Sequence, residues 1–296
     1  MGYVFLFAAL ISGITKGYCG KKTSGYVNEY KDAMLFNSIR MAICVLIGTV
    51  MLAATGKINF LHTNITVLLV TLLSGFANSA FVVLWLVSAK KGSYMMLDVF
   101  CMLGVLIPII GCAVFFGEPV GVNAIIGIVI LIAAVGIMCS YNNTIKQKIT
   151  VSAFIILLFC GISNGLSDFS QKLFVNLTKD VPIAVFNLYT YLFSAILLIA
   201  CFAFFKAKSD NDEAINIKPI LKYVFIMSVC LFLNSYFKTC AAKYLPSAQL
   251  YPLSQGGGLI LSSVMSAVAF RERLTVKAIC GIDNNKHIVN RRVRND

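Results

Sequence analysis

The chain has 296 residues, of which 59% are hydrophobic and only 12% are charged, whereas about a quarter of the residues in a soluble domain are charged. With a mean hydropathy of +0.85, too few polar side chains remain to cover a water-exposed surface, which excludes a soluble globular protein. The net charge of +13 is distributed between apolar runs, so it favours a membrane topology over a nucleic-acid partner.

Apolar runs separated by short polar connections follow one another along the chain. A membrane-spanning helix needs about 20 residues, because the bilayer core is about 30 Å thick. The runs are apolar around their whole circumference, which favours helices over barrel strands. The predicted spans are 3–20, 34–55, 65–88, 93–116, 121–141, 152–172, 182–205, 220–242 and 246–270.

The two halves of the chain resemble each other. When they are aligned, Ser93 to Ile128 falls on Ser247 to Ile282, and polar residues match as well as glycines. The matched positions include Gly13/Gly161, Gly17/Gly165, Phe36/Phe186, Asn37/Asn187, Asn78/Asn234, Ser79/Ser235, Gly104/Gly258 and Glu118/Glu272. The matched order of polar residues favours an internal repeat over a chance similarity between apolar helices.

We therefore expect an all-α integral membrane fold, an inverted repeat of five-helix halves, because an odd number of helices inserts the second half upside down. The full pattern has ten transmembrane helices, about nine of them complete in this chain. The first repeat is predicted at 1–145, and the second at 146–282 with an incomplete fifth helix. Residues 283–296 are predicted to be a disordered, polar basic tail, too short and too charged to span.

Lys and Arg are concentrated in the connections that follow the odd-numbered spans. Because basic connections stay in the cytoplasm, the N-terminus of this multi-pass protein is predicted to lie outside the cell membrane. The partners that we expect are the lipid bilayer and a small-molecule solute, with no nucleic acid. The sequence leaves the oligomeric state open.

Ionisable residues inside the predicted spans are candidates for function, because each costs about 2.5 to 3.5 kcal/mol on insertion. Asp98 is too short to reach the membrane surface, so it either binds a proton or a cationic group or pairs with a neighbouring base. For Lys16, Arg40 and Lys238 we favour snorkelling to the interface; facing inward, they would suit an anionic or carboxylate-bearing solute. Asp168, near a helix end, is predicted to be interfacial.

Uncharged polar residues add to the candidate cavity. Asn78 and Asn234 occupy matched positions and either line a central cavity or form hydrogen bonds between helices. Gln255 completes the set of candidate substrate-binding residues. Pro108 and Pro252 are expected to interrupt their spans. Four aromatic residues are expected in the interfacial belt, namely Trp85, Tyr94, Tyr244 and Tyr251.

Signals for catalysis are missing from the sequence. It contains no HExxH, GxSxG, P-loop or dinucleotide-binding glycine motif, and its histidines are His62 and His287 alone. The ten cysteines form no CxxC pair and lie mostly in apolar runs, so they predict packing residues rather than disulfides or metal ligands. We expect no enzyme activity, no cofactor and no metal.

The combined features resemble a known family. The glycine-rich first span from Gly13 to Gly17, Arg40 in the second span, and the segments Gly117-Glu118-Pro119 and Arg271-Glu272-Arg273 are similar to EamA-type members of the drug/metabolite transporter superfamily. The similarity extends nearly to Ile282, where the tenth helix is cut short. The resemblance implies a ten-helix inverted-repeat carrier with a central cavity, and a loop or helix-capping role for Glu118 and Glu272.

The function predicted is therefore the transport of a small metabolite, amino acid or drug by alternating access, with proton coupling as an option. Two alternatives remain. The chain could be a non-transporting membrane receptor or assembly protein, in which the intramembrane polar residues serve packing alone. It could also be an inactive remnant of a transporter whose last helix is truncated.

Overall fold

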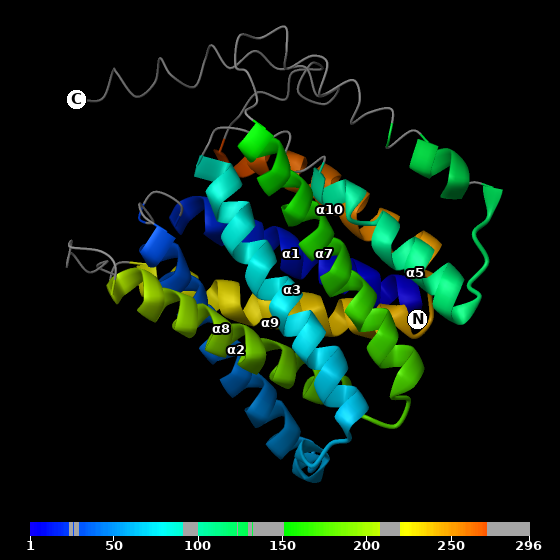
Figure 1. The fold of residues 1–296 in the computed structure, drawn as a ribbon, viewed down its shortest axis with the longest axis horizontal. Helices are drawn as coiled ribbons and strands as arrows, with labels where there is room; N and C mark the ends of the chain where they lie inside the picture. Colours follow the sequence, from blue (N-terminus) through cyan, green and yellow to red (C-terminus); the bar gives the residue numbers. More distant parts are fainter. Residues whose placement is uncertain are drawn as a thin grey trace, which may run out of the picture.

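The computed structural model describes residues 1–23, 26, 30–90, 100–122, 124–129, 132, 151–207 and 220–270. In this part of the chain the fold is a bundle of α-helices without strands (Figure 1). Several predictions lie outside the described residues. They concern Asp98, Tyr94, Glu272, most of the span 121–141, the incomplete tenth helix and the tail 283–296.

The helices follow the predicted spans closely. They are α1 (Gly2–Thr23), α2 (Tyr30–Ala54), α3 (Ile65–Lys90), α5 (Leu106–Phe116), α7 (Val151–Leu177), α8 (Ile183–Ala207), α9 (Leu221–Ala242) and α10 (Ser247–Phe270), with a short 3-10 helix η2 (Ile58–Leu61) between α2 and α3. Helices α1, α2, α3, α7, α8 and α9 each contain a stretch long and apolar enough to cross a membrane. The chain is thus an all-α, multi-pass membrane protein.

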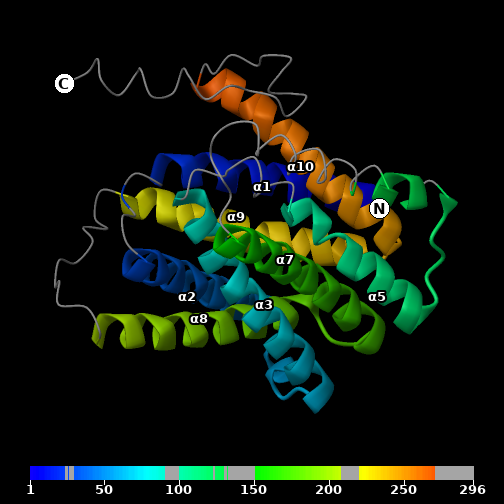
Figure 2. The ribbon, with the colours of Figure 1, turned by 45° about the horizontal axis from the view of Figure 1, so that its top comes forward.

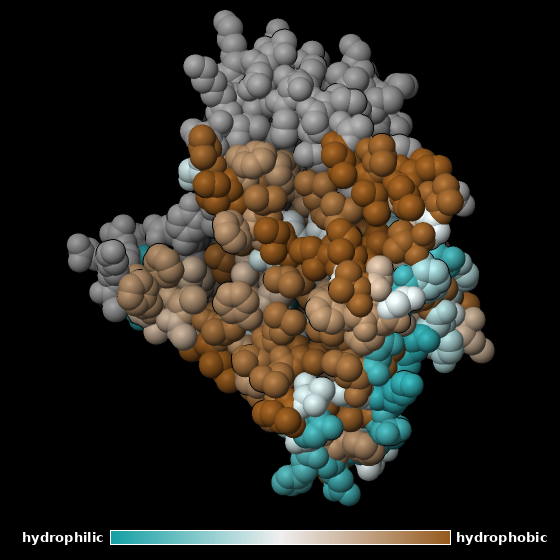
Figure 3. Space-filling view, turned by 45° about the vertical axis from the view of Figure 1, so that its right-hand side comes forward, coloured by the Kyte–Doolittle hydropathy of each residue, from teal (hydrophilic) through white to brown (hydrophobic). Residues whose placement is uncertain are grey.

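The surface is apolar, unlike that of a soluble protein, and the interior holds polar side chains among its apolar core clusters. Large side chains such as Leu46, Val50 and Phe76 are exposed, and apolar residues cover most of the face in Figure 3, with hydrophilic ones gathered at its lower edge. Inside, Thr71 and Ser228 are fully buried and donate to carbonyls one turn earlier, over 2.7 and 2.8 Å. Lipid solvates the apolar surface, and local hydrogen bonds satisfy the polar groups in the interior.

Helices from the two halves of the chain pack against each other (Figure 2). The most extensive contacts join α1 to α9, α2 to α8, α3 to α7 and α3 to α8, and further contacts join α2 to α9, α1 to α10 and α5 to α7. Direct packing within one half is slight by comparison, as between α2 and α3. The interior of the bundle is therefore lined by both halves together.

The predicted span 93–116 is broken, although not at the proline itself. The chain is helical over 100–103, turns at Gly104 and Val105, and continues as α5. In a continuous helix the ring of Pro108 would clash with the carbonyl of Gly104, four residues earlier, and Pro108 has no N–H to donate to it. The helix therefore breaks at Gly104. By contrast, α10 runs through Pro252 without a break, so the prediction of an interruption there is wrong.

The break lies where two backbones meet. A Cβ atom on Gly165 would collide with the Gly104 carbonyl oxygen, and one on Gly161 would collide with the Phe100 carbonyl oxygen. Small residues spaced four apart on α7 let the 100–104 segment approach to backbone contact. We call this contact the closed seam.

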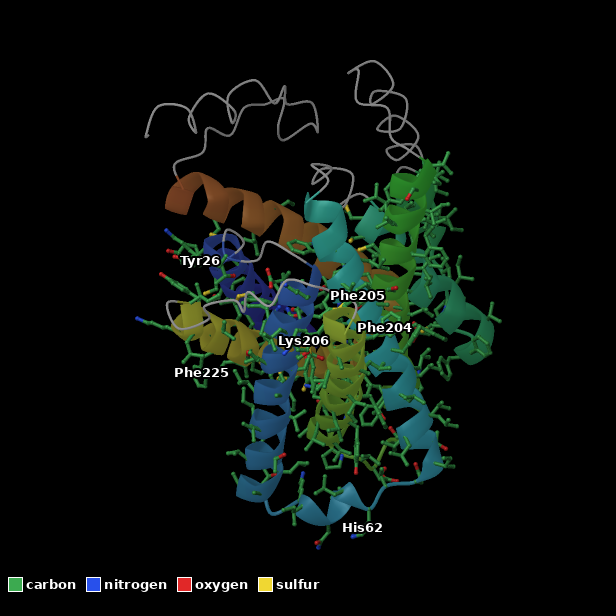
Figure 4. The ribbon with its side chains drawn as sticks, turned by 60° about the vertical axis from the view of Figure 1, so that its left-hand side comes forward. Tyr26, His62, Phe204, Phe205, Lys206 and Phe225 are labelled. Atoms are coloured by element: carbon green, nitrogen blue, oxygen red, sulfur yellow. The ribbon has the colours of Figure 1, made fainter. Side chains whose placement is uncertain are left out.

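The connections gather at the two ends of the bundle. At the first end, the Tyr3 hydroxyl contacts the Gln249 side chain at 3.2 Å, and the Tyr189 hydroxyl donates to the Leu61 carbonyl over 2.8 Å. This end therefore unites the start of α1 with the α2–α3, α7–α8 and α9–α10 connections, and His62 lies at its extremity (Figure 4). Exposed aromatic side chains near the other end are Tyr26, Phe204, Phe205 and Phe225.

Candidate substrate-binding site

Four ionisable side chains from four helices lie in the interior of the bundle. Arg40 on α2, Asp168 on α7 and Lys238 on α9 are 7%, 3% and 8% exposed, and Lys16 on α1 is half-buried. The prediction that Arg40 and Lys238 snorkel to the interface is wrong, and so is the interfacial placement of Asp168, because neighbouring helices enclose these groups. We call Lys16, Arg40, Asp168 and Lys238 the charged centre.

Lys238 and Asp168 form an ion pair between α9 and α7. The Lys238 ammonium lies 2.5 Å from Asp168 Oδ1 and 5.5 Å from the centre of the Tyr251 ring. The Tyr251 hydroxyl donates to the Asp168 backbone carbonyl over 2.6 Å. Tyr251 is fully buried, so its predicted place in the interfacial belt is wrong. The pair neutralises both charges and ties α10 to them.

Arg40 has no carboxylate partner in the described part of the chain. Its Nη1 donates to Asn37 Oδ1 over 2.8 Å, and its guanidinium lies 5.7 Å from the centre of the Phe36 ring. Its Nε is buried without a hydrogen bond. One turn further along α2, the Cys44 thiol contacts the Ser228 carbonyl of α9 at 3.3 Å, so this face of α2 points into the bundle.

Lys16 points toward α9 from the other side. On the same face of α1, a Cβ on Gly13 would lie 3.1 Å from Asn234 Nδ2, and one on Gly20 would lie 3.5 Å from Met227 Cε. Lys16 lies between these two glycines at helical spacing. Cys19, one turn further along this face of α1, packs in one cluster with Phe36 of α2 and Val224 of α9, so Lys16 lies on the side of α1 that faces both helices. No acidic side chain among the described residues pairs with it.

The uncharged candidates have separate roles. Asn78 on α3 donates to Ser194 Oγ on α8 over 3.0 Å, and Asn234 on α9 donates to the Ala9 carbonyl on α1 over 2.7 Å. Both therefore make the interhelical hydrogen bonds that the sequence left as one alternative. Gln255 is half-buried on α10, with no hydrogen-bond partner in the described residues.

A second buried ion pair, which the sequence did not predict, lies at the first end. Gly117, at φ 63°, ends α5 in the left-handed conformation and turns Glu118 toward α7 and α10. Glu118 accepts from the Lys172 ammonium over 2.8 Å and from the Ser247 backbone N–H over 2.7 Å, while Lys172 also donates to the Leu245 carbonyl. Glu118 thus has the expected helix-capping role, at the start of α10.

The charge state of Glu118 follows from these contacts. Burial alone raises its pKa, but the hydrogen bonds from Lys172 and Ser247 outweigh burial and hold the pKa of the carboxyl below its ordinary value. Glu118 is therefore ionised at neutral pH. The sequence offered two signals for this pair, since Lys172 and Glu118 each lie at the end of a predicted span. Their spacing in the sequence did not show that the two residues pair with each other.

A pocket of 260 Å³ opens between α1, α2, α8 and α9 at the first end. Its lining includes Lys57, Lys243 and Tyr236. From Tyr236, aromatic contacts lead inward through Phe232 to Tyr191, with ring centres 6.3 and 6.2 Å apart. Tyr191 packs in one cluster with Met41, the residue next to Arg40 on α2. An aromatic layer therefore separates this pocket from Arg40.

The chain matches no protein-family model, and no curated protein shows significant similarity to it. In the described residues, no group of three or more His, Cys, Asp or Glu could hold a metal ion. The site must consequently be interpreted from its own chemistry.

Proposed function

We propose that the protein is a secondary carrier that moves a small solute across the membrane by alternating access. The observation that carries this proposal is the charged centre. It places four ionisable groups from both halves of the chain inside the bundle, where each is costly unless it serves a purpose. In carriers, binding residues near the mid-plane between two repeats serve that purpose.

The helix contacts support an inverted repeat. The sequence alignment relates α1 to α7, α2 to α8, α3 to α9 and α5 to α10. Exchanging the halves then converts the α1–α9 contact into α7–α3, α2–α9 into α8–α3, and α1–α10 into α7–α5, and all of these contacts are present. The α2–α8 contact converts into itself. This is the pattern that two repeats related by a two-fold axis would produce.

Two seams related by the repeat differ, which supports alternating access. The closed seam brings Gly104 and Gly165 into backbone contact. Its counterpart between α1 and α10 is looser. A Cβ on Gly17 or Gly256 would meet nothing within 4 Å, and one on Gly257 would reach only the Leu10 side chain at 3.2 Å. A carrier that exchanges two such arrangements opens each side in turn.

The proposal includes a family and a membrane topology for this carrier. The resemblance to EamA-type transporters agrees with a carrier of ten helices in two repeats. We place the protein in the cell membrane with its N-terminus outside, because the first end gathers the connections that are poor in Lys and Arg. The first end would then face the exterior.

Uptake into proteoliposomes tests the proposal. Purified protein is reconstituted and supplied with a radiolabelled panel of anionic, cationic, zwitterionic and neutral metabolites. We expect saturable uptake of at least one class above that of protein-free liposomes, and faster exchange when the same solute is loaded inside. Uptake equal to that of protein-free liposomes for every class, from vesicles that contain folded protein, would contradict it.

A non-transporting receptor or assembly protein is the second candidate. It is favoured by Asn78 and Asn234, whose amide groups form hydrogen bonds between helices. Substituting the charged centre would then alter stability alone and leave every transport reading unchanged.

A further inference from the structure

The charged centre has an excess of positive charge. Asp168 already pairs with Lys238, so Lys16 and Arg40 remain as two cations without a counter-charge among the residues that the structure describes. The other acidic residues in the described part of the chain lie elsewhere. Glu118 pairs with Lys172, Asp180 is exposed at the α7–α8 connection, and Asp32 lies in the first turn of α2, two helical turns from Arg40.

One hydrogen-bond donor of the charged centre is unused. Arg40 Nε is buried without a partner in the described structure. Asn187 Nδ2 also lacks a partner there, but it lies nearer the first end: a Cβ on Gly48 would contact its neighbour Leu188, and Gly48 follows Arg40 by two helical turns. Buried donors are normally satisfied, so Arg40 Nε requires an acceptor from elsewhere.

A guanidinium and an ammonium together suit one kind of ligand. Among the described residues they present positive charge and donors with no unpaired carboxylate beside them, which matches the oxygens of a carboxylate or a phosphate. A cationic solute would be repelled by Lys16 and Arg40, and a neutral one would leave both charges uncompensated.

We infer that the charged centre binds a small oxyanion, a solute that carries a carboxylate or phosphate group. Arg40 and Lys16 hold the anionic group, with Arg40 Nε as an unused donor toward it. The Lys238–Asp168 pair stays intact and fixes α9 against α7 beside the site. This inference rests on the proposed carrier function, of which it names the solute class. At the first end, Lys57 and Lys243 would draw anions toward the pocket mouth.

Calorimetric titration of the purified full chain in detergent tests the inference directly. The probes are succinate, glycerol 3-phosphate, glycerol and putrescine at low ionic strength, with dioctanoyl phosphatidic acid as a lipid that carries the same oxyanion. We expect one or both of the water-soluble anions to bind and the neutral and cationic probes to show no heat of binding. Binding of putrescine or glycerol, or of phosphatidic acid alone, would overturn the inference.

Three variants locate the binding. Arg40→Lys keeps the charge but loses the fork of donors, and Lys16→Met removes one uncompensated charge; each should weaken anion binding at least tenfold. Lys222→Met is the matched control, because Lys222 is exposed on α9 and carries the same charge. It should bind as the parent protein does. Equal weakening in Lys16→Met and Lys222→Met would indicate a general charge effect and would overturn the assignment.

Stability separates a binding role for Lys16 from a structural one. If its charge is uncompensated without ligand, Lys16→Met does not lower the melting temperature of the ligand-free protein, yet it abolishes the rise that succinate or glycerol 3-phosphate produces. A lower melting temperature for the ligand-free variant would assign Lys16 to packing and overturn the inference. Anion binding without vesicle uptake would instead contradict the carrier function, and uptake of neutral or cationic solutes alone would contradict only the solute class.

Discussion

Removing one partner of the Lys238–Asp168 pair should destabilise the protein about as much as removing both partners together. The two side chains are 10% and 4% exposed, so solvent screens them little. Lys238→Met leaves a buried carboxylate whose Oδ2 already lacks a hydrogen bond. Asp168→Asn leaves a buried ammonium that keeps an amide oxygen and the Tyr251 ring as contacts but has no counter-charge. Each single variant should lose about 3 kcal/mol of unfolding free energy.

The double variant carries no uncompensated charge at either position. We expect it to lose about as much as one single variant, about 3 kcal/mol, which gives a coupling energy of about 3 kcal/mol. The measurement is equilibrium unfolding in mixed micelles by titration with dodecyl sulfate, followed by circular dichroism. The matched control combines Lys222→Met with Asp180→Asn at two exposed positions, where the losses should add within about 0.5 kcal/mol. A double variant of Lys238 and Asp168 that loses the sum of its singles would refute the reasoning.

Three further predictions concern other contacts. Glu118→Ala should cost about 3 kcal/mol, because it leaves Lys172 buried and the start of α10 uncapped; Glu118→Gln, which keeps an acceptor for the Ser247 N–H, should cost less in the same unfolding titration. Because folding lowers the pKa of Glu118, its charge stabilises the folded protein above the ordinary pKa of 4.5, and this stability is lost as the pH falls through the folded pKa. The difference in unfolding free energy between the parent and Glu118→Gln should therefore shrink in acid. A constant difference from pH 7 to pH 3 would count against this. Gly161→Ala should lower the melting temperature by forcing the closed seam apart, whereas Gly17→Ala, with open space around it, should raise it slightly through helix propensity; equal shifts would show that the seam is not tightly packed.

The helices themselves could be predicted from the sequence, because length and apolarity decide whether a segment crosses a bilayer. The break at Gly104 was harder to place. Pro108 signalled an interruption, but the affected carbonyl lies four residues earlier. Pro252, with the same signal, leaves α10 intact. A proline therefore indicates strain in a helix without fixing how the chain relieves it.

The residues of the charged centre could be predicted as candidates, but their environment could not. A lysine at a helix end can reach the interface or point inward, and only the neighbouring helices decide. Lys238 points inward because Asp168 lies on α7, 70 positions away in sequence. The position of Asn234 was suggested by the repeat, yet its hydrogen bond to Ala9 depends on the distance between α1 and α9. Partners distant in sequence are set by packing, which composition and spacing do not encode.

The most direct test of the carrier function is counterflow in proteoliposomes. Vesicles loaded with unlabelled succinate or glycerol 3-phosphate are diluted into the labelled compound, for the parent protein, Arg40→Lys and Lys222→Met. We predict a transient accumulation of label above that of protein-free vesicles, saturable in solute, retained in Lys222→Met and reduced at least tenfold in Arg40→Lys. Accumulation no greater than in protein-free vesicles, for these anions and for every other class in the panel, would contradict the proposal that this protein is a carrier.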